Sequence, residues 1–96
     1  MKHKLLPLSV TMHYILLVLR EPNHGYAVMQ KVQELSNNKV ILAPGTLYGA
    51  IENLSKHGWI RQVDEVDRRK IYHITDEGIE ILEQERERLL HIINLY

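Results

Sequence analysis

The chain contains no cysteine, so disulfide bonds, thiolate zinc sites and cysteine nucleophiles are excluded. It also lacks a long apolar run, because the longest one covers residues 14–19 and a bilayer span needs about 20 residues. Lysines precede apolar residues near the N-terminus, but no small-residue cleavage site follows them. We therefore expect a cytoplasmic protein that does not associate with a membrane.

The sequence is equally poor in signatures of catalysis. The histidines at positions 3, 13, 24, 57, 73 and 91 show no metal-ligand spacing on a common helix face. There is no glycine-rich phosphate loop and no nucleophile elbow. We therefore expect no enzymatic activity, no bound metal and no cofactor.

The size and charge of the chain favour association with partners. A chain of 96 residues forms one small domain with a marginal core, so an oligomer is expected. The formal net charge is zero but uneven: residues 76–96 hold six acidic and two basic side chains, a net charge of −4. The remaining ten basic and six acidic side chains give residues 1–75 a net charge of +4. This asymmetry is a weak indication of a polyanionic partner for the basic part.

The apolar periodicity and the turn residues define the expected secondary structure. In order, they predict helices over residues 8–20 and 24–36, a short extended piece at 40–42, a helix over 46–57, strands at 59–63 and 70–74, and a helix from 76 to the end. Gly58 is expected to cap the third helix in a left-handed conformation, and Thr75 to cap the last helix. The inner stripe of the second helix is expected to consist of Tyr26, Met29, Val32 and Leu35.

Three helices followed by a two-stranded hairpin are the winged helix-turn-helix arrangement. In that arrangement the third helix enters a DNA major groove and the hairpin contacts the backbone or the minor groove. The predicted fold is mainly α (α+β), with a winged helix-turn-helix DNA-binding domain over residues 1–75 and a C-terminal dimerisation helix over residues 76–96.

The third helix carries the strongest functional signal. One face is apolar, and the opposite face holds short or planar hydrogen-bonding groups, with a lysine nearby: Thr46, Tyr48, Gly49, Asn53 and Lys56. Hydroxyl groups suit phosphate oxygens, and an asparagine can pair with adenine through two hydrogen bonds. A glycine there is unfavourable for a helix and makes sense if another backbone must come close. The alternative is an ordinary solvated face.

The hairpin tip carries the second signal, the adjacent cations Arg68, Arg69 and Lys70. Three neighbouring positive charges repel one another, and DNA phosphates would offset that repulsion. The alternative is a solvated turn in which nearby acids balance the cations, namely Asp64, Glu65 and Asp67.

The last helix carries a heptad seam that predicts a homodimer. Its members are spaced alternately by three and four positions, with Arg86 as the polar exception: Ile79, Leu82, Arg86, Leu89, Ile93 and Tyr96. The distal end of this helix has little of its own domain left to pack on. The alternative, which does not exclude the first, is packing on the first helix of the same chain.

Five short motifs, in the same order, resemble the PadR family of transcriptional regulators: His24-Gly25-Tyr26, Pro44-Gly45-Thr46-Leu47-Tyr48, Gly58-Trp59-Ile60, Arg68-Arg69-Lys70-Ile71-Tyr72 and Ile74-Thr75-Asp76-Glu77-Gly78. The resemblance implies a bacterial-type homodimeric repressor that dimerises through its first and last helices, where we place Leu16. It also implies that Thr46 and Tyr48 face DNA and that Arg68, Arg69 and Lys70 form the wing.

In some family members a small ligand releases the repressor from DNA. Some short members hold flat aromatic compounds between the last helices of the dimer with a tryptophan. The single tryptophan here is Trp59, at the start of the first hairpin strand, so the chain departs from that pattern.

The leading hypothesis is therefore a sequence-specific DNA-binding transcriptional repressor. It would bind double-stranded DNA at an inverted-repeat operator as a homodimer and be released by a small-molecule ligand, with small aromatic compounds as candidates. The first alternative is a winged-helix protein-interaction module that does not bind DNA. The second is a metal-sensing regulator, against which the absence of cysteine and of paired histidine spacing counts.

Overall fold

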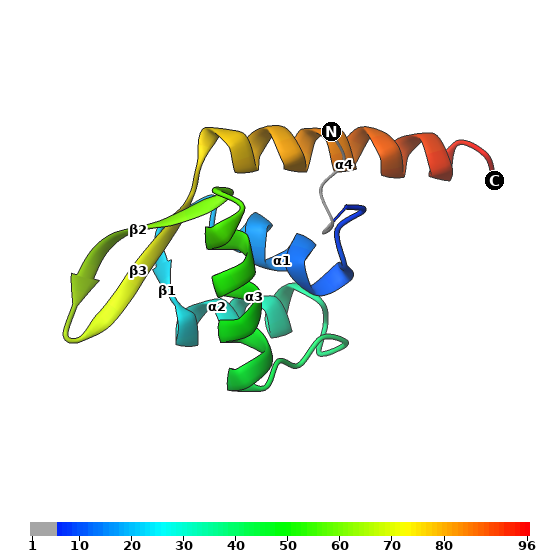
Figure 1. Ribbon diagram of the computed structural model, residues 1–96. Coiled ribbons are helices and arrows are strands. Elements are labelled where there is room, and N and C mark those ends of the chain that lie inside the picture. The colour runs from blue at the N-terminus through cyan, green and yellow to red at the C-terminus, as the bar shows by residue number, and fades with distance from the viewer. Residues whose placement is uncertain (1–5) are drawn as a thin grey trace.

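The computed structural model describes residues 6–96, so the first five positions of the predicted domain, His3 among them, lie outside the described residues. Residues 6–96 form four helices and a small antiparallel sheet (Figure 1). Their bounds are α1 Val10–Val18, β1 Asn23–His24, α2 Gly25–Leu35, α3 Pro44–Lys56, β2 Ile60–Val66, β3 Arg69–Ile74 and α4 Asp76–Ile93. The predicted order of helices and hairpin is confirmed, and the division of the chain at residue 75 stays a prediction.

The sheet has the strand order β1-β3-β2, and its first strand was not expected from the sequence. Residues 40–42, predicted as an extended piece, belong to no strand. Instead Asn23 pairs with Tyr72 and His24 with Ile71. A strand of two residues after a proline is too short to show an alternating pattern, so only its pairing with β3 reveals it.

The hairpin turn is tighter than the predicted tip over residues 64–69. Val66 pairs with Arg69, which leaves Asp67 and Arg68 as the two turn residues. Both have left-handed backbone angles, with φ of 51° and 65° respectively. This is the backbone hand that two-residue hairpin turns require. Arg69 and Lys70 therefore belong to β3 rather than to a loop.

The core lies where α1, α2 and α3 meet the base of the sheet. The predicted apolar face of α3 is buried, but the predicted stripe of α2 is partly wrong, since Tyr26 and Leu35 are exposed. Val32 is buried as predicted and Met29 is partly buried against the core, while Gly25 and Val28 complete the buried side because the helix packs through a face rotated from the predicted one. The buried apolar residues are Leu8, Ile15, Leu16, Val18, Leu19, Val28, Val32, Leu42, Leu47, Ala50, Ile51, Leu54, Trp59, Ile60, Ile74, Ile81 and Leu82.

Both predicted caps are present at the base of the hairpin. Gly58 adopts the expected left-handed conformation, with φ of 74°. The hydroxyl of Thr75 accepts a hydrogen bond from the Gly78 amide at 3.1 Å and donates one to the Gly58 carbonyl at 2.6 Å. A Cβ on Gly78 would collide with the carbonyl oxygen of Trp59. The start of α4 therefore lies directly against the residues that lead into β2.

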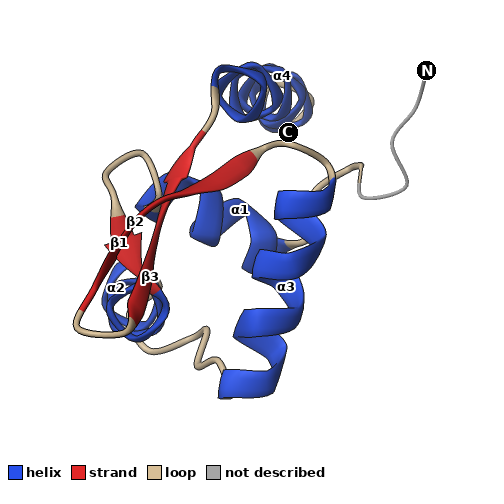
Figure 2. Cartoon of the chain, turned by 60° about the vertical axis from the view of Figure 1, so that its left-hand side comes forward, coloured by secondary structure: helices blue, strands red, loops and turns tan. Residues whose placement is uncertain are grey.

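The helix α4 crosses one side of the domain (Figures 1 and 2), and burial shows that it is docked only through its first half. Ile81, Leu82 and Glu85 are buried, whereas the apolar residues from Leu89 onward are exposed. In the view of Figure 1 the far end of α4 points away from the hairpin. No helix of residues 6–96 is long and apolar enough to cross a membrane.

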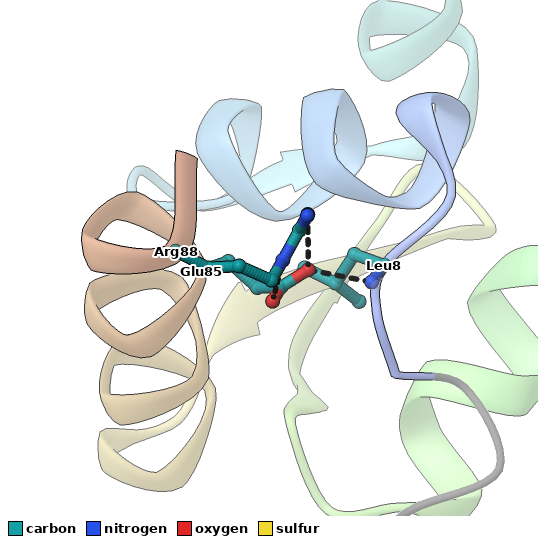
Figure 3. A network of polar contacts seen from close by, with 3 residues as sticks. All are labelled: Leu8, Glu85 and Arg88. Carbon is teal, nitrogen blue, oxygen red and sulfur yellow. Dashed lines mark hydrogen bonds and ion pairs between the residues drawn. The ribbon is translucent and has the colours of Figure 1, made fainter. Parts of the chain in front are cut away.

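Glu85 ties α4 to the segment that precedes α1, as Figure 3 shows. Its Oε1 accepts the Leu8 amide proton at 2.6 Å, and Arg88 donates to both carboxylate oxygens, at 2.8 and 3.2 Å. Burial raises the pKa of Glu85, but the hydrogen bonds from Arg88 and Leu8, together with the positive charges of Arg88 and His13, outweigh burial and hold the pKa below its usual value.

Candidate nucleic-acid interface

The polar face of α3 is exposed along its whole length. Its five predicted members, Thr46, Tyr48, Gly49, Asn53 and Lys56, all lie at the surface. On the opposite side Leu47, Ala50, Ile51 and Leu54 hold the helix in the core. The ammonium group of Lys56 lies 3.4 Å from Glu52, but both side chains are about two-thirds exposed, so this ion pair is weak.

Tyr48 joins α3 to α2. A Cβ placed on Gly25 would lie only 2.7 Å from the Tyr48 hydroxyl oxygen, so the phenol ring lies directly over this glycine. Any larger residue at position 25 would displace the ring. The motifs around Gly25 and Tyr48, which lie far apart in the sequence, are therefore one packing unit, and the side-chain pattern gave no sign of it.

Two hollows meet at Tyr48. The first, of about 530 Å³, runs between α3 and the hairpin and is lined by Tyr48, Ile51, Glu52, Ser55, Ile60, Arg61, Gln62, Lys70 and Tyr72. The second, of about 320 Å³, lies between the start of α2 and the hairpin and is lined by His24, Gly25, Tyr26, Tyr48, Arg68, Arg69, Lys70 and Tyr72. The structure thus brings Tyr48 together with all three hairpin cations, whereas Thr46, Gly49, Asn53 and Lys56 line neither hollow.

The hairpin cations are free of carboxylate partners. Within residues 6–96 no ion pair involves Arg68, Arg69 or Lys70. The Asp64 carboxylate accepts the Glu65 amide proton at 2.7 Å instead. Direct ion pairing by the neighbouring acids therefore does not account for this cluster.

Sequence reasoning missed His24, Tyr26 and Tyr72 as parts of this surface. His24 is the N-cap of α2 and its Nε2 lies 3.3 Å from Nη1 of Arg69. The motif that contains His24 and Tyr26 was a signal of resemblance, but nothing in its spacing shows that it faces the hairpin. The pairing of β1 with β3 places it there.

A third hollow, of about 370 Å³, lies on another side, between α1 and α4. It is lined by His13, Leu17, Arg20, Ile79, Leu82, Glu83, Arg86, Leu89, Leu90 and Ile93. Among the predicted dimer residues, Leu89, Ile93 and Tyr96 are 41%, 64% and 101% exposed, and Ile79 is also exposed. Leu82 is buried in the chain's own core, and Leu16 is 0% exposed, so Leu16 has no surface to offer a partner.

The sequence also matches a known family over most of its length. The model of the family described as "Transcriptional regulator PadR-like family" matches residues 15–84. The chain belongs to this PadR-like family. The matched segment begins within α1, includes α2, α3 and the hairpin, and ends within the docked half of α4. The family is one of transcriptional regulators, which is not an enzymatic class.

Solved structures share the fold of this PadR-like chain. A transcriptional regulator from Clostridium thermocellum is 28% identical, with a TM-score of 0.74 over 90% of this chain and 88% of that chain. F93 from STIV, a winged-helix DNA-binding protein, is 17% identical, with a TM-score of 0.72 over 86% of this chain and 87% of that chain. The second likeness is one of fold alone, and it confirms the winged-helix prediction.

Curated relatives of this PadR-like chain are longer. The transcriptional regulator YqjI of Escherichia coli (strain K12) is 26% identical over 73% of this chain and 34% of its own length. The chain spans 18% to 34% of the length of the curated relatives it matches.

Proposed function

We propose that the protein is a repressor that binds double-stranded DNA sequence-specifically, with α3 in the major groove and the hairpin as the wing. The observation that carries this proposal is the shared position of Tyr48, whose ring borders both hollows together with Lys70. The polar face of α3 and the hairpin cations, which form no ion pair within residues 6–96, thus border one continuous surface. Such a surface matches a duplex that presents base edges and phosphates side by side.

Each group on this surface has a chemistry that suits part of the duplex. Asn53 can read adenine through its amide, while the hydroxyls of Thr46 and Tyr48 can reach phosphate oxygens. A Cβ added to Gly49 would meet nothing within 4 Å, so the space outside this position is open to a DNA backbone. The cations Lys56, Arg68, Arg69 and Lys70 would neutralise phosphates.

The same proposal includes a homodimer held by the distal half of α4. Exposure of Leu89, Ile93 and Tyr96 to water is unfavourable, because burying an apolar side chain is worth about 1.5–3 kcal/mol. A two-fold dimer would present two α3 helices to successive major grooves, about 34 Å apart, so the operator would be an inverted repeat. Release by a small ligand belongs to the proposal as well. Trp59 is fully buried and would not stack on that ligand.

Selection from a random duplex pool tests this function. The full chain should enrich an inverted repeat, and its affinity for the enriched duplex should fall steeply as salt rises. A chain that enriches no sequence and binds no duplex even at low salt would contradict DNA binding and leave a protein-interaction module as the explanation.

A further inference from the structure

The hairpin touches α2 through an unusual contact between two nitrogen atoms. Nη1 of Arg69 lies 3.3 Å from Nε2 of His24, although the residues are 45 positions apart in the sequence. The two residues lie on neighbouring strands: His24 belongs to β1, and Arg69 begins β3, in which Ile71 pairs with His24. The sheet therefore places the two residues close together, although they are far apart in the sequence.

The protons on His24 leave this contact without an acceptor. Its Nδ1 accepts the Ala27 amide proton at 3.3 Å and so caps α2. A neutral imidazole carries one ring proton, which must then lie on Nε2, and a guanidinium only donates. Two donors therefore face each other. In the other neutral tautomer the ring proton lies on Nδ1, where it faces the amide proton of Ala27. In the doubly protonated ring both nitrogens carry a proton, so each of them faces a donor.

The surroundings of the two donors suit an anion. The hollow of about 320 Å³ that contains them has no carboxylate among its lining residues. It holds two further cations, Arg68 and Lys70, and three phenol groups, from Tyr26, Tyr48 and Tyr72. A group with several anionic oxygens could accept from His24 and Arg69 at once and from a phenol as well.

We propose that this hollow binds one phosphate group of the DNA backbone, whose oxygens bridge His24 of α2 and Arg69 of the wing. The inference rests on the proposed function and adds to it a defined phosphate site. A backbone phosphate is favoured over a free one because the hollow shares Tyr48, Lys70 and Tyr72 with the hollow that runs along α3. A strand lying along α3 would thus carry its own phosphate into the site.

The proposal assigns His24 a positioning function besides capping. With the phosphate in place, the wing and the start of α2 would be joined through a shared anion instead of facing each other with like donors. Bound DNA should therefore hold the hairpin more rigidly against α2 than the free protein does.

A scan with single uncharged phosphates tests the site. Duplexes of the selected operator would carry one methylphosphonate per half-site, at each position in turn. The variants are Arg69→Ala and His24→Asn, because asparagine keeps a good N-cap for Ala27 but lacks the ring that reaches Arg69. The control is Lys31→Ala, a loss of one positive charge on α2 at a residue that lines neither hollow.

One methylphosphonate position per half-site should weaken wild-type binding by about 10-fold to 100-fold, the range expected for a hydrogen bond to a charged group. At that same position Arg69→Ala and His24→Asn should lose little further affinity, whereas Lys31→Ala should respond as the wild type does. If both variants lose the same factor at every position, the shared phosphate site does not exist, although DNA binding itself stands. If the wild type binds no duplex, the proposed function fails first.

Inorganic phosphate distinguishes a free ligand from DNA. In the full chain without DNA, the ring resonances of His24 would be followed by NMR during a phosphate titration. Weak shifts that do not saturate agree with a site built for a tethered phosphate. Saturable binding of free phosphate, abolished in Arg69→Ala and accompanied by a flat methylphosphonate scan, would overturn the assignment to DNA.

Discussion

The distal half of α4 and the hairpin both expose many side chains to solvent, but the chemistry of those side chains differs. From Leu89 to the end of the chain the exposed side chains are mainly apolar. On the hairpin the exposed side chains include the three adjacent cations Arg68, Arg69 and Lys70, and within residues 6–96 no carboxylate forms an ion pair with them. Apolar surface is stabilised by another apolar surface, and clustered cations by a polyanion. The two surfaces therefore suit partners of different chemistry, and they do not share residues.

The two surfaces lie at opposite ends of the molecule. The net charge of −4 over residues 76–96 comes from acids at or before Glu87, so the exposed apolar segment from Leu89 onward carries no Asp or Glu. The hairpin lies at one end of the molecule and the C-terminus at the other (Figure 1). The acidic residues of α4 lie between these two ends, in the part of the helix that begins directly after β3.

The largest effect is expected from substitutions in the distal half of α4. Replacing Leu89 and Ile93 by glutamate should abolish the homodimer, because each side chain contributes about 1.5–3 kcal/mol when buried and a dimer holds two copies of each. Sedimentation at micromolar concentration measures the mass, and DNA binding should fall with it. The pair Gln84→Glu and Asn94→Glu adds the same charge at polar positions and should remain dimeric. A wild type that is a well-folded monomer would defeat the proposal.

Removing the hairpin charge tests the other surface. Arg68, Arg69 and Lys70 replaced together by alanine should weaken binding to all duplexes alike. The slope of log affinity against log salt should fall by up to about 0.9 for each phosphate that a chain no longer neutralises. The oligomeric mass should stay unchanged, which separates this effect from that of α4. An unaltered slope would mean that the cluster does not touch DNA.

Substitutions on α3 should affect sequence preference rather than general affinity. Asn53→Ala should lose about 1–3 kcal/mol at the selected operator and less on unrelated duplexes. Tyr48→Phe should also weaken specific binding, while its ring keeps its packing over Gly25. Thermal unfolding would establish that both variants remain folded. Equal affinities of wild type and variants for both kinds of duplex would remove these residues from the interface.

Glu85 lies at the boundary between the docked and bare halves of α4. Glu85→Ala should lower the free energy of unfolding by about 1–3 kcal/mol, because the buried Leu8 amide loses its acceptor. The exposed Glu80→Ala is the control. Since the pKa of Glu85 is lowered in the folded protein, its contribution is complete above the unfolded value of about 4.3. It is lost as the pH falls through the folded value. The free energies of unfolding of wild type and Glu85→Ala, measured by urea titration, should therefore converge as the pH falls through the folded-state pKa of Glu85.

The smallest effect is expected at the hairpin turn. Arg68 has a φ of 65°, a left-handed conformation that is unfavourable for a side chain with a Cβ. Arg68→Gly should therefore raise the free energy of unfolding by up to about 1 kcal/mol while removing one cation. Arg68→Ala removes the same charge without this relief. A lower melting temperature for the glycine variant than for the alanine variant would contradict the proposed backbone strain.

Local signals explain what could be predicted from the sequence. The apolar face of α3, the cap at Gly58 and the cap at Thr75 depend on neighbouring residues, so their patterns are visible in the chain. The burial of Leu16 and the rotated face of α2 depend on which helices meet, which periodicity does not show. Glu85 is one of six acidic residues in its helix. Only its position against Leu8 distinguishes it from the solvated ones.

The bond between Leu8 and Glu85 joins residues 77 positions apart, and this separation bears on how the protein folds. Closing a loop of that length costs about 4 kcal/mol in chain entropy, more than one hydrogen bond to a carboxylate returns. The contact therefore forms only after the helices and hairpin between its ends have assembled. During synthesis it must wait until Glu85 has left the ribosome. Exchange of the Leu8 amide proton with solvent would thus report the completion of folding.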